Sequence, residues 1–177
     1  NITFVGTGKD TTTILGGFHI ENFENITFKN MTVTNTSDNG TGIRMRNAKV
    51  ELIDVALKGC TNCALHSNTS ATTVVATRCE FANSRVGALV EGSLTIATFN
   101  NCVFHDNEED GLQGWPLSTT HLHGEATAIH SNKECGIYAT EYGKILIHLP
   151  SDHNTSYNNG QEDRYTDSGG TITNVED

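Results

Sequence analysis

Apolar residues recur along the chain at intervals of 23 to 25 positions. One column of such residues consists of Ile2, Ile26, Val50, Val74, Ala97, Leu122, Ile147 and Ile172. Two further columns keep the same interval, namely Val33, Leu57, Phe81, Phe104 and Ile129, and Ile43, Leu65, Leu89, Leu112 and Ile137. A repeat of this length is typical of a solenoid, because one repeat cannot bury its apolar side alone and stacked repeats share a core.

Within each repeat, apolar and polar residues alternate, as in Ile26-Thr27-Phe28 and Val50-Glu51-Leu52. A period of two is the period of a β-strand. Asn, Asp, Gly and Ser fill the segments between the strands, and no segment has the 3.6-residue period of a helix. The pattern predicts an all-β fold, a right-handed single-stranded parallel β-helix of about seven coils with 22–25 residues each.

The columns also predict which side chains form the core, namely Val50, Val74, Phe81, Leu89, Phe104 and Leu112. A chain of 177 residues is long enough for one domain, so we expect residues 1–177 to form a single β-helix. Because the sequence starts at Asn1 without a leader, we expect a segment or the mature form of a longer chain. The first column extends to both ends of the chain, from Ile2 to Ile172. We therefore expect self-association or continuation of the solenoid there.

The charge balance restricts the class of partner. The chain has 11 basic and 21 acidic residues, which give a net charge of −10. Nucleic acids and anionic membranes are held mainly by clustered Lys and Arg, so we expect neither as a partner. No apolar run approaches the roughly 18 residues of a membrane-spanning helix, so we expect no membrane span.

Several Asn-x-Ser/Thr sequences are candidates for N-glycosylation. Beyond the one at Asn1, they lie at Asn25, Asn30, Asn35, Asn39, Asn68 and Asn154. Glycans at such sites mark surface loops of secreted proteins, which favours an extracellular or cell-surface location. A chain rich in Asn, Ser and Thr also produces such sequences by chance, and Asn serves turns in β-helices. Both interpretations remain open at this stage.

The cysteines suggest a disulfide or a pair of buried thiols. Cys79 and Cys102 fall in one inward column, so neighbouring coils bring their Cα atoms to about 4.8 Å, which permits a disulfide. Two buried thiols that pack as small apolar groups are the alternative. Cys60 and Cys63 form one C-x-x-C, but zinc sites need a second pair of ligands. We therefore expect no metal site in the cysteines and no cofactor.

Histidines form two outward pairs. His105 and His130, and likewise His123 and His148, are separated by 25 residues and are expected to stack on neighbouring coils. Adjacent imidazoles can share a transition metal. Without a third ligand nearby, however, such pairs are more often surface ladders, so the sequence predicts no metal site.

An acidic turn, Glu108 to Asp110, is followed by Gln113 and Trp115, and Tyr138 belongs to the next coil. Aromatic rings stack on sugars and acids accept their hydroxyls, so this group is a candidate ligand-binding site for a polysaccharide. Arg44 and His66 are expected on the same face and extend the candidate site. A solvated turn beside an anchored Trp is the alternative interpretation.

The first coil, from Asn1 to Ile14, resembles the opening coil of pectin methylesterases. The elements Asn101 to Phe104, Asp110 to Leu112 and Cys135 to Ile137 resemble repeats of the pectin-lyase-like β-helix superfamily. The resemblance covers nearly the whole chain and implies the fold. It does not imply one activity, because these repeats occur in lyases, hydrolases, esterases, carbohydrate-binding modules and non-enzymatic proteins. The catalytic motifs of the pectin methylesterases and polygalacturonases are absent from the sequence.

Two functions follow as alternatives. The first is a non-catalytic extracellular structural or surface protein, glycosylated, that displays a binding face or assembles end to end, with no catalytic residues. The second is a carbohydrate-binding or carbohydrate-active protein, in which Asp106 and Asp110 could act as an acid and base pair.

Overall fold

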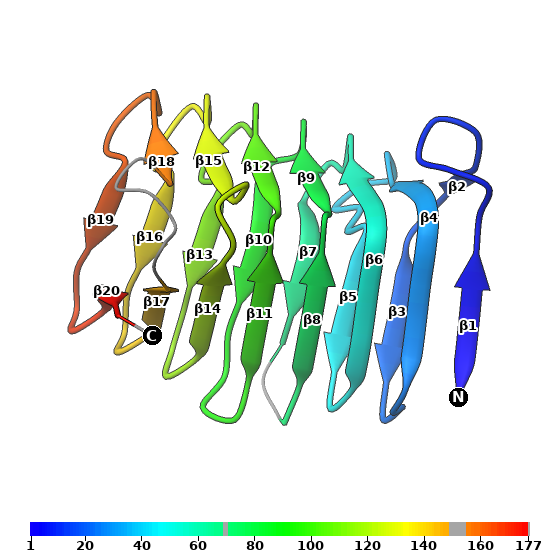
Figure 1. Ribbon diagram of the computed structural model, residues 1–177, viewed down its shortest axis with the longest axis horizontal. Helices are drawn as coiled ribbons and strands as arrows, with labels where there is room; N and C mark the ends of the chain where they lie inside the picture. Colours follow the sequence, from blue (N-terminus) through cyan, green and yellow to red (C-terminus); the bar gives the residue numbers. More distant parts are fainter. Residues whose placement is uncertain (69–70, 149–154, 177) are drawn as a thin grey trace.

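The computed structural model describes residues 1–68, 71–148 and 155–176. All regular elements in these ranges are strands, and all strand pairs are parallel. No helix in this part of the chain is long and apolar enough to cross a bilayer. The coils stack along the long axis, and β1 and β20 lie near opposite ends (Figure 1). The predicted all-β parallel solenoid is confirmed.

Each coil has three faces. The first face contains β1 (Ile2–Val5), β4 (Ile26–Thr34), β6 (Lys49–Lys58), β8 (Thr73–Thr77), β11 (Ile96–Asn100), β14 (Thr119–His123), β17 (Lys144–His148) and β20 (Thr171–Val175). The second face contains β2 (Thr13–Leu15), the later parts of β4 and β6, β9 (Glu80–Ala82), β12 (Val103–His105), β15 (Ala128–His130) and β18 (Ser156–Tyr157). The third face contains β3 (Phe18–Glu21), β5 (Ile43–Arg46), β7 (Cys63–Ser67), β10 (Val86–Val90), β13 (Leu112–Gly114), β16 (Ile137–Ala139) and β19 (Arg164–Thr166).

The long strands β4 and β6 connect two of the faces. Both run without interruption from the first face to the second, so these two faces form one 13-stranded sheet. The third face is a separate sheet of seven strands, one for each coil. The apolar columns point into the space that the three faces enclose, where they form one continuous core.

Five of the six predicted core residues are buried, namely Val50, Val74, Phe81, Phe104 and Leu112. The prediction for Leu89 is wrong, because its side chain is partly exposed and its position in the register is opposite His66. Ala88 takes the inward position between Leu65 and Leu112. A shift of one residue along a strand moves a side chain to the other face, and this explains the error.

The columns agree with the observed register, with one further exception. In the second column, every predicted neighbour is paired, from Val33 to Ile129. In the first column, Ala97 lies opposite Thr120 rather than Leu122, and Ile145 rather than Ile147 lies opposite Ile172. The predicted register is shifted by two residues at Leu122 and Ile147. A shift of two leaves a side chain on the same face of the strand, so both residues are still buried in the core.

Cys79 and Cys102 are buried free thiols. In this structure the two residues therefore pack as free thiols, which is the alternative to the disulfide. The Cys102 thiol donates to the carbonyl oxygens of Asn100 (3.4 Å) and Ala76 (3.5 Å), and the Cys79 thiol donates to that of Thr77 (3.4 Å). These contacts satisfy the two thiols without a covalent bond. Burial raises the pKa of the Cys102 thiol, which keeps it protonated and unreactive.

Residues with left-handed backbone form two corners in successive coils. The corner between the first and second faces uses Asn30, Asp54, Arg78 and Asn101, each with φ between 52° and 54°. The corner between the second and third faces uses Asn83, Asp106, Ser131 and Asn158, with φ between 50° and 58°. Asn and Asp tolerate this conformation better than most residues, because their short polar side chains bond locally. The abundance of Asn therefore follows in part from the corners.

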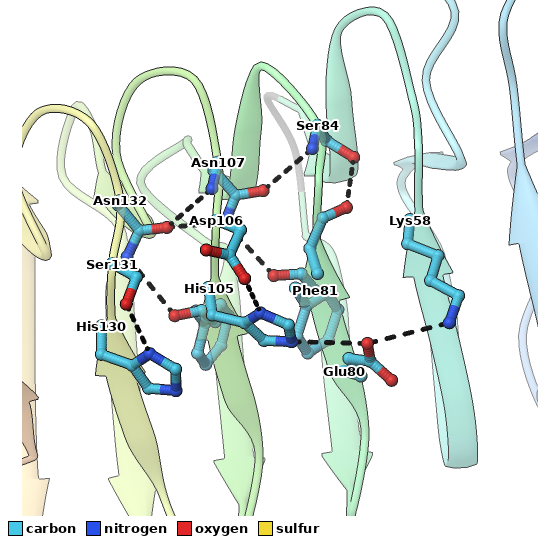
Figure 2. A network of polar contacts seen from close by, with 12 residues as sticks. Lys58, Glu80, Phe81, Ser84, His105, Asp106, Asn107, His130, Ser131 and Asn132 are labelled. Carbon is cyan, nitrogen blue, oxygen red and sulfur yellow. Dashed lines mark hydrogen bonds and ion pairs between the residues drawn. The ribbon is translucent and has the colours of Figure 1, made fainter.

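A ladder of polar side chains, buried except for the partly buried Asn159, runs along the second corner, one residue after each left-handed position. Its members are Ser84, Asn107, Asn132 and Asn159 (Figure 2 shows the first three). The Asn107 Nδ2 donates to Asn132 Oδ1 (2.8 Å), and the Asn132 Nδ2 donates to Asn159 Oδ1 (2.9 Å). Each backbone N–H in turn donates to the next side-chain oxygen, as from Asn107 to Asn132 (3.2 Å). The ladder thus satisfies backbone groups that the corners would otherwise leave buried and unpaired.

The core position of Phe104 gives a first prediction. Its ring stacks on Phe81 at 4.7 Å and meets the edge of Phe99 at 5.1 Å, and it is fully buried. Phe104→Ala should lower the free energy of unfolding by about 3–5 kcal/mol, the usual cost of emptying a buried aromatic site. Thr98→Ala, on the outer side of β11, is the control and should cost little. Denaturant titration measures both, and equal losses would contradict the assigned inner and outer faces.

The asparagine ladder gives a second prediction. Asn132→Ala removes the acceptor of two donors from Asn107, and each buried group left unsatisfied costs about 1–3 kcal/mol. We expect denaturant titration to give a loss of at least about 2 kcal/mol. Asn100→Ala, on the outer side of β11, should change the free energy of unfolding by no more than about 0.5 kcal/mol. An Asn132→Ala chain as stable as the Asn100→Ala chain would show that the ladder contributes nothing.

Candidate functional site

The outer side of the third face brings the predicted ligand-binding residues into one column. Successive strands contribute His19, Arg44, His66, Leu89, Gln113, Tyr138 and Tyr165. Four of the five predicted ligand-binding residues thus stand in a single row along the axis. The fifth, Trp115, follows the end of β13, and its backbone N–H donates to the Val90 carbonyl (2.8 Å). This row, with Trp115 beside it, is called the third-face row below.

Several members of the row bond to neighbouring residues. His66 Nε2 lies 3.0 Å from the Glu91 carboxylate, and both side chains are partly buried. The Tyr138 hydroxyl donates to Asp167 Oδ2 at 3.0 Å, and the Thr140 hydroxyl donates to the other oxygen of the same carboxylate. Burial and the neighbouring Asp167 carboxylate raise the pKa of Tyr138, whereas the bond from Thr140 lowers the pKa of Asp167. Tyr138 therefore stays a neutral donor beside a charged acceptor.

Gln113 and Asp110 serve the turn rather than the surface. Gln113 is 8% exposed and its Nε2 donates to Asp110 Oδ2 at 2.7 Å. The other oxygen of Asp110 accepts a bond of 2.7 Å from the backbone N–H of Cys135, on the next coil. Asp110 is itself 3% exposed. One carboxylate oxygen thus holds the turn within its own coil, and the other joins it to the next coil.

Asp106, the other candidate acid, has a different environment. It is a left-handed corner residue (φ 54°), equivalent to Asn83 and Ser131 in the coils before and after it. Its Oδ2 lies 2.7 Å from His105 Nδ1. The two acids share no partner among the residues that the structure describes, and corner geometry accounts for the choice of Asp at this position. Each acid thus has its own partners, His105 for Asp106, and Gln113 with the Cys135 N–H for Asp110.

His105 lies at the centre of an outer network on the second face (Figure 2). Its Nε2 is 3.4 Å from Glu80, which is itself 3.9 Å from Lys58 Nζ. The His105 ring stacks on His130 at 5.4 Å, as the sequence predicts. Burial and the neighbouring His105 lower the pKa of His130, which favours its neutral form. Partly exposed pairs of this kind hold neighbouring coils together with modest energies.

The second predicted histidine pair gains a partner that the sequence reasoning missed. His123 and His148 stack at 4.0 Å, as expected, and His121 joins them on the same outer side of the first face. The available signal was the sequence His121-Leu122-His123, because residues two apart in a strand point the same way. Three imidazoles in one group are ligands that a transition metal can use.

The glycosylation candidates differ in exposure. The exposed ones are Asn25, Asn30 and Asn39, whereas Asn35 and Asn68 are partly buried and Asn154 lies outside the described residues. The Asn35 Nδ2, the atom that would carry a glycan, donates to the Thr41 carbonyl at 2.9 Å. In the folded chain, a glycan therefore fits more readily on Asn25 or Asn39 than on Asn35.

Comparisons with known proteins place the chain in a family. No curated protein matches it. A solved structure titled "Geobacillus virus E2 - ORF18" is similar with a TM-score of 0.48 and 10% sequence identity, over 99% of this chain and 50% of that chain. The chain thus spans about half the length of the viral protein. The family described as "Right handed beta helix region" matches residues 13–160, more than half of the chain, so the protein belongs to the right-handed β-helix family.

Proposed function

We propose that this chain is a non-catalytic structural β-helix of the cell surface or extracellular space, which joins further coils at its ends and displays its outer faces to partners. The observation that carries the proposal is the open apolar surface of the first coil. Ile2 and Phe4 belong to the inward columns, yet they are 46% and 37% exposed, whereas their neighbours Ile26 and Phe28 are buried. An uncovered core and an unpaired strand edge favour association with more β-sheet.

The last coil has the same character. Ile172 continues the first column but is only partly buried, and β20 is mostly exposed along its length. Two open ends of one parallel β-helix present complementary edges, since the N-terminal edge of one copy can pair with the C-terminal edge of another. A head-to-tail contact of this kind produces filaments when the rotation between copies does not close.

The use of the candidate acids supports a role without catalysis. Asp110 binds a backbone N–H and the Gln113 amide, so its two oxygens hold the turn. Asp106 occupies a recurring corner position. The requirements of the fold therefore explain why Asp stands at positions 106 and 110, without a catalytic role for either residue.

The association of the ends can be tested with a matched pair of variants. Ile2 and Ile96 are the same residue type with the same 46% exposure, but Ile2 belongs to the open first coil and Ile96 to the side of the helix. We expect the isolated 177-residue chain to associate in light scattering and to form end-to-end assemblies in electron microscopy. Ile2→Lys should suppress association, whereas Ile96→Lys should not. A chain that stays monomeric at high concentration would contradict the proposal.

The role of Asp110 gives a further prediction. Asp110→Asn should lower the free energy of unfolding by about 1–3 kcal/mol, because it weakens a charge-assisted bond to the Cys135 N–H. Asp106→Asn is the control and should cost no more than about 1 kcal/mol, since Asn suits the corner and the bond to His105 is exposed. We expect neither pectin de-esterification nor polygalacturonate cleavage from the wild type. Turnover that Asp110→Asn abolishes would favour the catalytic alternative.

A polysaccharide is the second candidate partner, and the third-face row favours it. Tyr138 and Tyr165 lie 5.4 Å apart in successive coils, with exposed Arg44 further along the same row. A row of aromatic and polar groups repeated at the coil spacing suits an extended ligand. Pull-down on cell-wall polysaccharides with Arg44→Ala and Tyr165→Ala variants tests this candidate.

The proposed extracellular location has a separate test. Intact mass before and after glycosidase treatment of natively produced protein gives the glycan content.

A further inference from the structure

Three histidines form a compact group on the outer side of the first face. His121 and His123 lie two residues apart on β14, and His148 ends the neighbouring strand β17. The register pairs His121 with Leu146 and Leu122 with Ile147, so the next position pairs His123 with His148. All three side chains are partly buried, and the leucine and isoleucine beneath them belong to the core. Two strands of a rigid sheet thus determine the position of the group.

The imidazole nitrogens are close enough to serve one ion. One nitrogen from each ring can be chosen such that the three lie within 4.8 Å of one another. The His121 Nδ1 and the His148 Nε2 are 2.9 Å apart, and the rings of His123 and His148 stack at 4.0 Å. A tetrahedral zinc with Zn–N bonds of about 2.0–2.1 Å separates its nitrogen ligands by roughly 3.3 Å. Small rotations of the side chains are sufficient to reach this geometry.

The residues around the group can be read from the strand register. Burial, together with the proximity of His148 and His123, lowers the pKa of His121. The positions on either side of the group in the same columns are Thr98 and Asn100 on β11, and Thr173 and Val175 on β20. These neighbours carry no charge. The group therefore offers three imidazole nitrogens, a set that selects zinc and related transition metals over calcium or magnesium.

We propose that His121, His123 and His148 bind one divalent transition metal ion of the zinc class, on the outer surface of the sixth and seventh coils. The three imidazoles supply three ligands, and a water molecule on the solvent side supplies the fourth. In the free protein, a proton lies between His121 Nδ1 and His148 Nε2. When the ion binds, that proton moves to the other nitrogen of its ring, and both lone pairs turn to the metal.

The bound ion would connect β14 with β17, so it would add a coordinate link to the hydrogen bonds between two coils. A carboxylate or imidazole of another molecule can replace the water at the fourth position. This inference does not depend on the proposed structural role, because it concerns the side of the helix rather than its ends.

The chain provides its own control for this site. His105 and His130 also stack on neighbouring coils at 5.4 Å on an outer face. Their ring nitrogens instead contact Glu80, Asp106 and Ser131, and no third imidazole belongs to the cluster among the described residues. A pair without a third histidine tests whether stacked imidazoles alone are sufficient for binding.

The test uses the 177-residue chain without an affinity tag. Isothermal titration calorimetry with Zn²⁺ should give one ion per chain, and Co²⁺ should give the visible absorption of a four-coordinate site. Each of His121→Ala, His123→Ala and His148→Ala should weaken zinc binding at least about tenfold, or 1.4 kcal/mol. The double variant His105→Ala/His130→Ala should bind as the wild type does. At the same zinc concentration, Zn²⁺ should also raise the Tm of the wild type more than that of His121→Ala.

Circular dichroism of the metal-free variants checks that each retains the β-sheet signal, which the outward position of the side chains leads us to expect. Less than half an ion per chain in the wild type would overturn the proposal. Equal losses in the control double variant and in the three single variants would also overturn it, as would zinc binding that persists without His121 and His148.

Discussion

The structure depends on the parallel register between successive coils. Because each strand pairs residue by residue with the strands of the next coil, each position lies about 4.8 Å from its counterpart, and the same chemistry must recur there. Inward positions repeat as apolar columns and corner positions repeat as left-handed residues. Polar side chains inside the corner bond to one another from coil to coil, as those from Ser84 to Asn159 do. The repeat in the sequence is a direct result of this constraint.

The sequence was sufficient for the fold because periodicity identifies inward positions without knowledge of the partners. The column from Val33 to Ile129 was predicted in correct register, since bulky residues occur there at nearly constant spacing. Leu89 was assigned incorrectly because Ala88, a small residue, holds the inward position, and hydrophobicity favoured its larger neighbour. At Leu122 the predicted register is shifted by two residues, so the inward face is correct but the paired residue is not. Alternation of apolar and polar residues alone cannot distinguish positions that are two apart.

The candidate site was less accessible from the sequence. Arg44, His66, Gln113 and Tyr138 were correctly placed on one face, but their partners were not predicted. Asp110 appeared to be a free acid, and only the structure shows its oxygens bound to Cys135 N–H and Gln113. Bonds between coils join residues about 25 positions apart, and their formation depends on side-chain direction as well as spacing. The third histidine, His121, could be predicted from the sequence, because it lies two residues before His123 on one strand and so points the same way.

The ladder along the second corner has a consequence for how the molecule opens. It begins where the Cys60 backbone N–H donates to Ser84 Oγ (3.0 Å), so the coils before this point contain none of its bonds. At the N-terminal end, the exposed Phe4 and the partly buried Phe18 of the first coil pack on the buried Phe28 of the second. In a solenoid each coil is stabilised only by its neighbours, so local stability varies along the axis. Opening from the N-terminal side therefore removes the exposed first coil before it reaches the long pairing of β4 with β6 and the coils that the ladder joins.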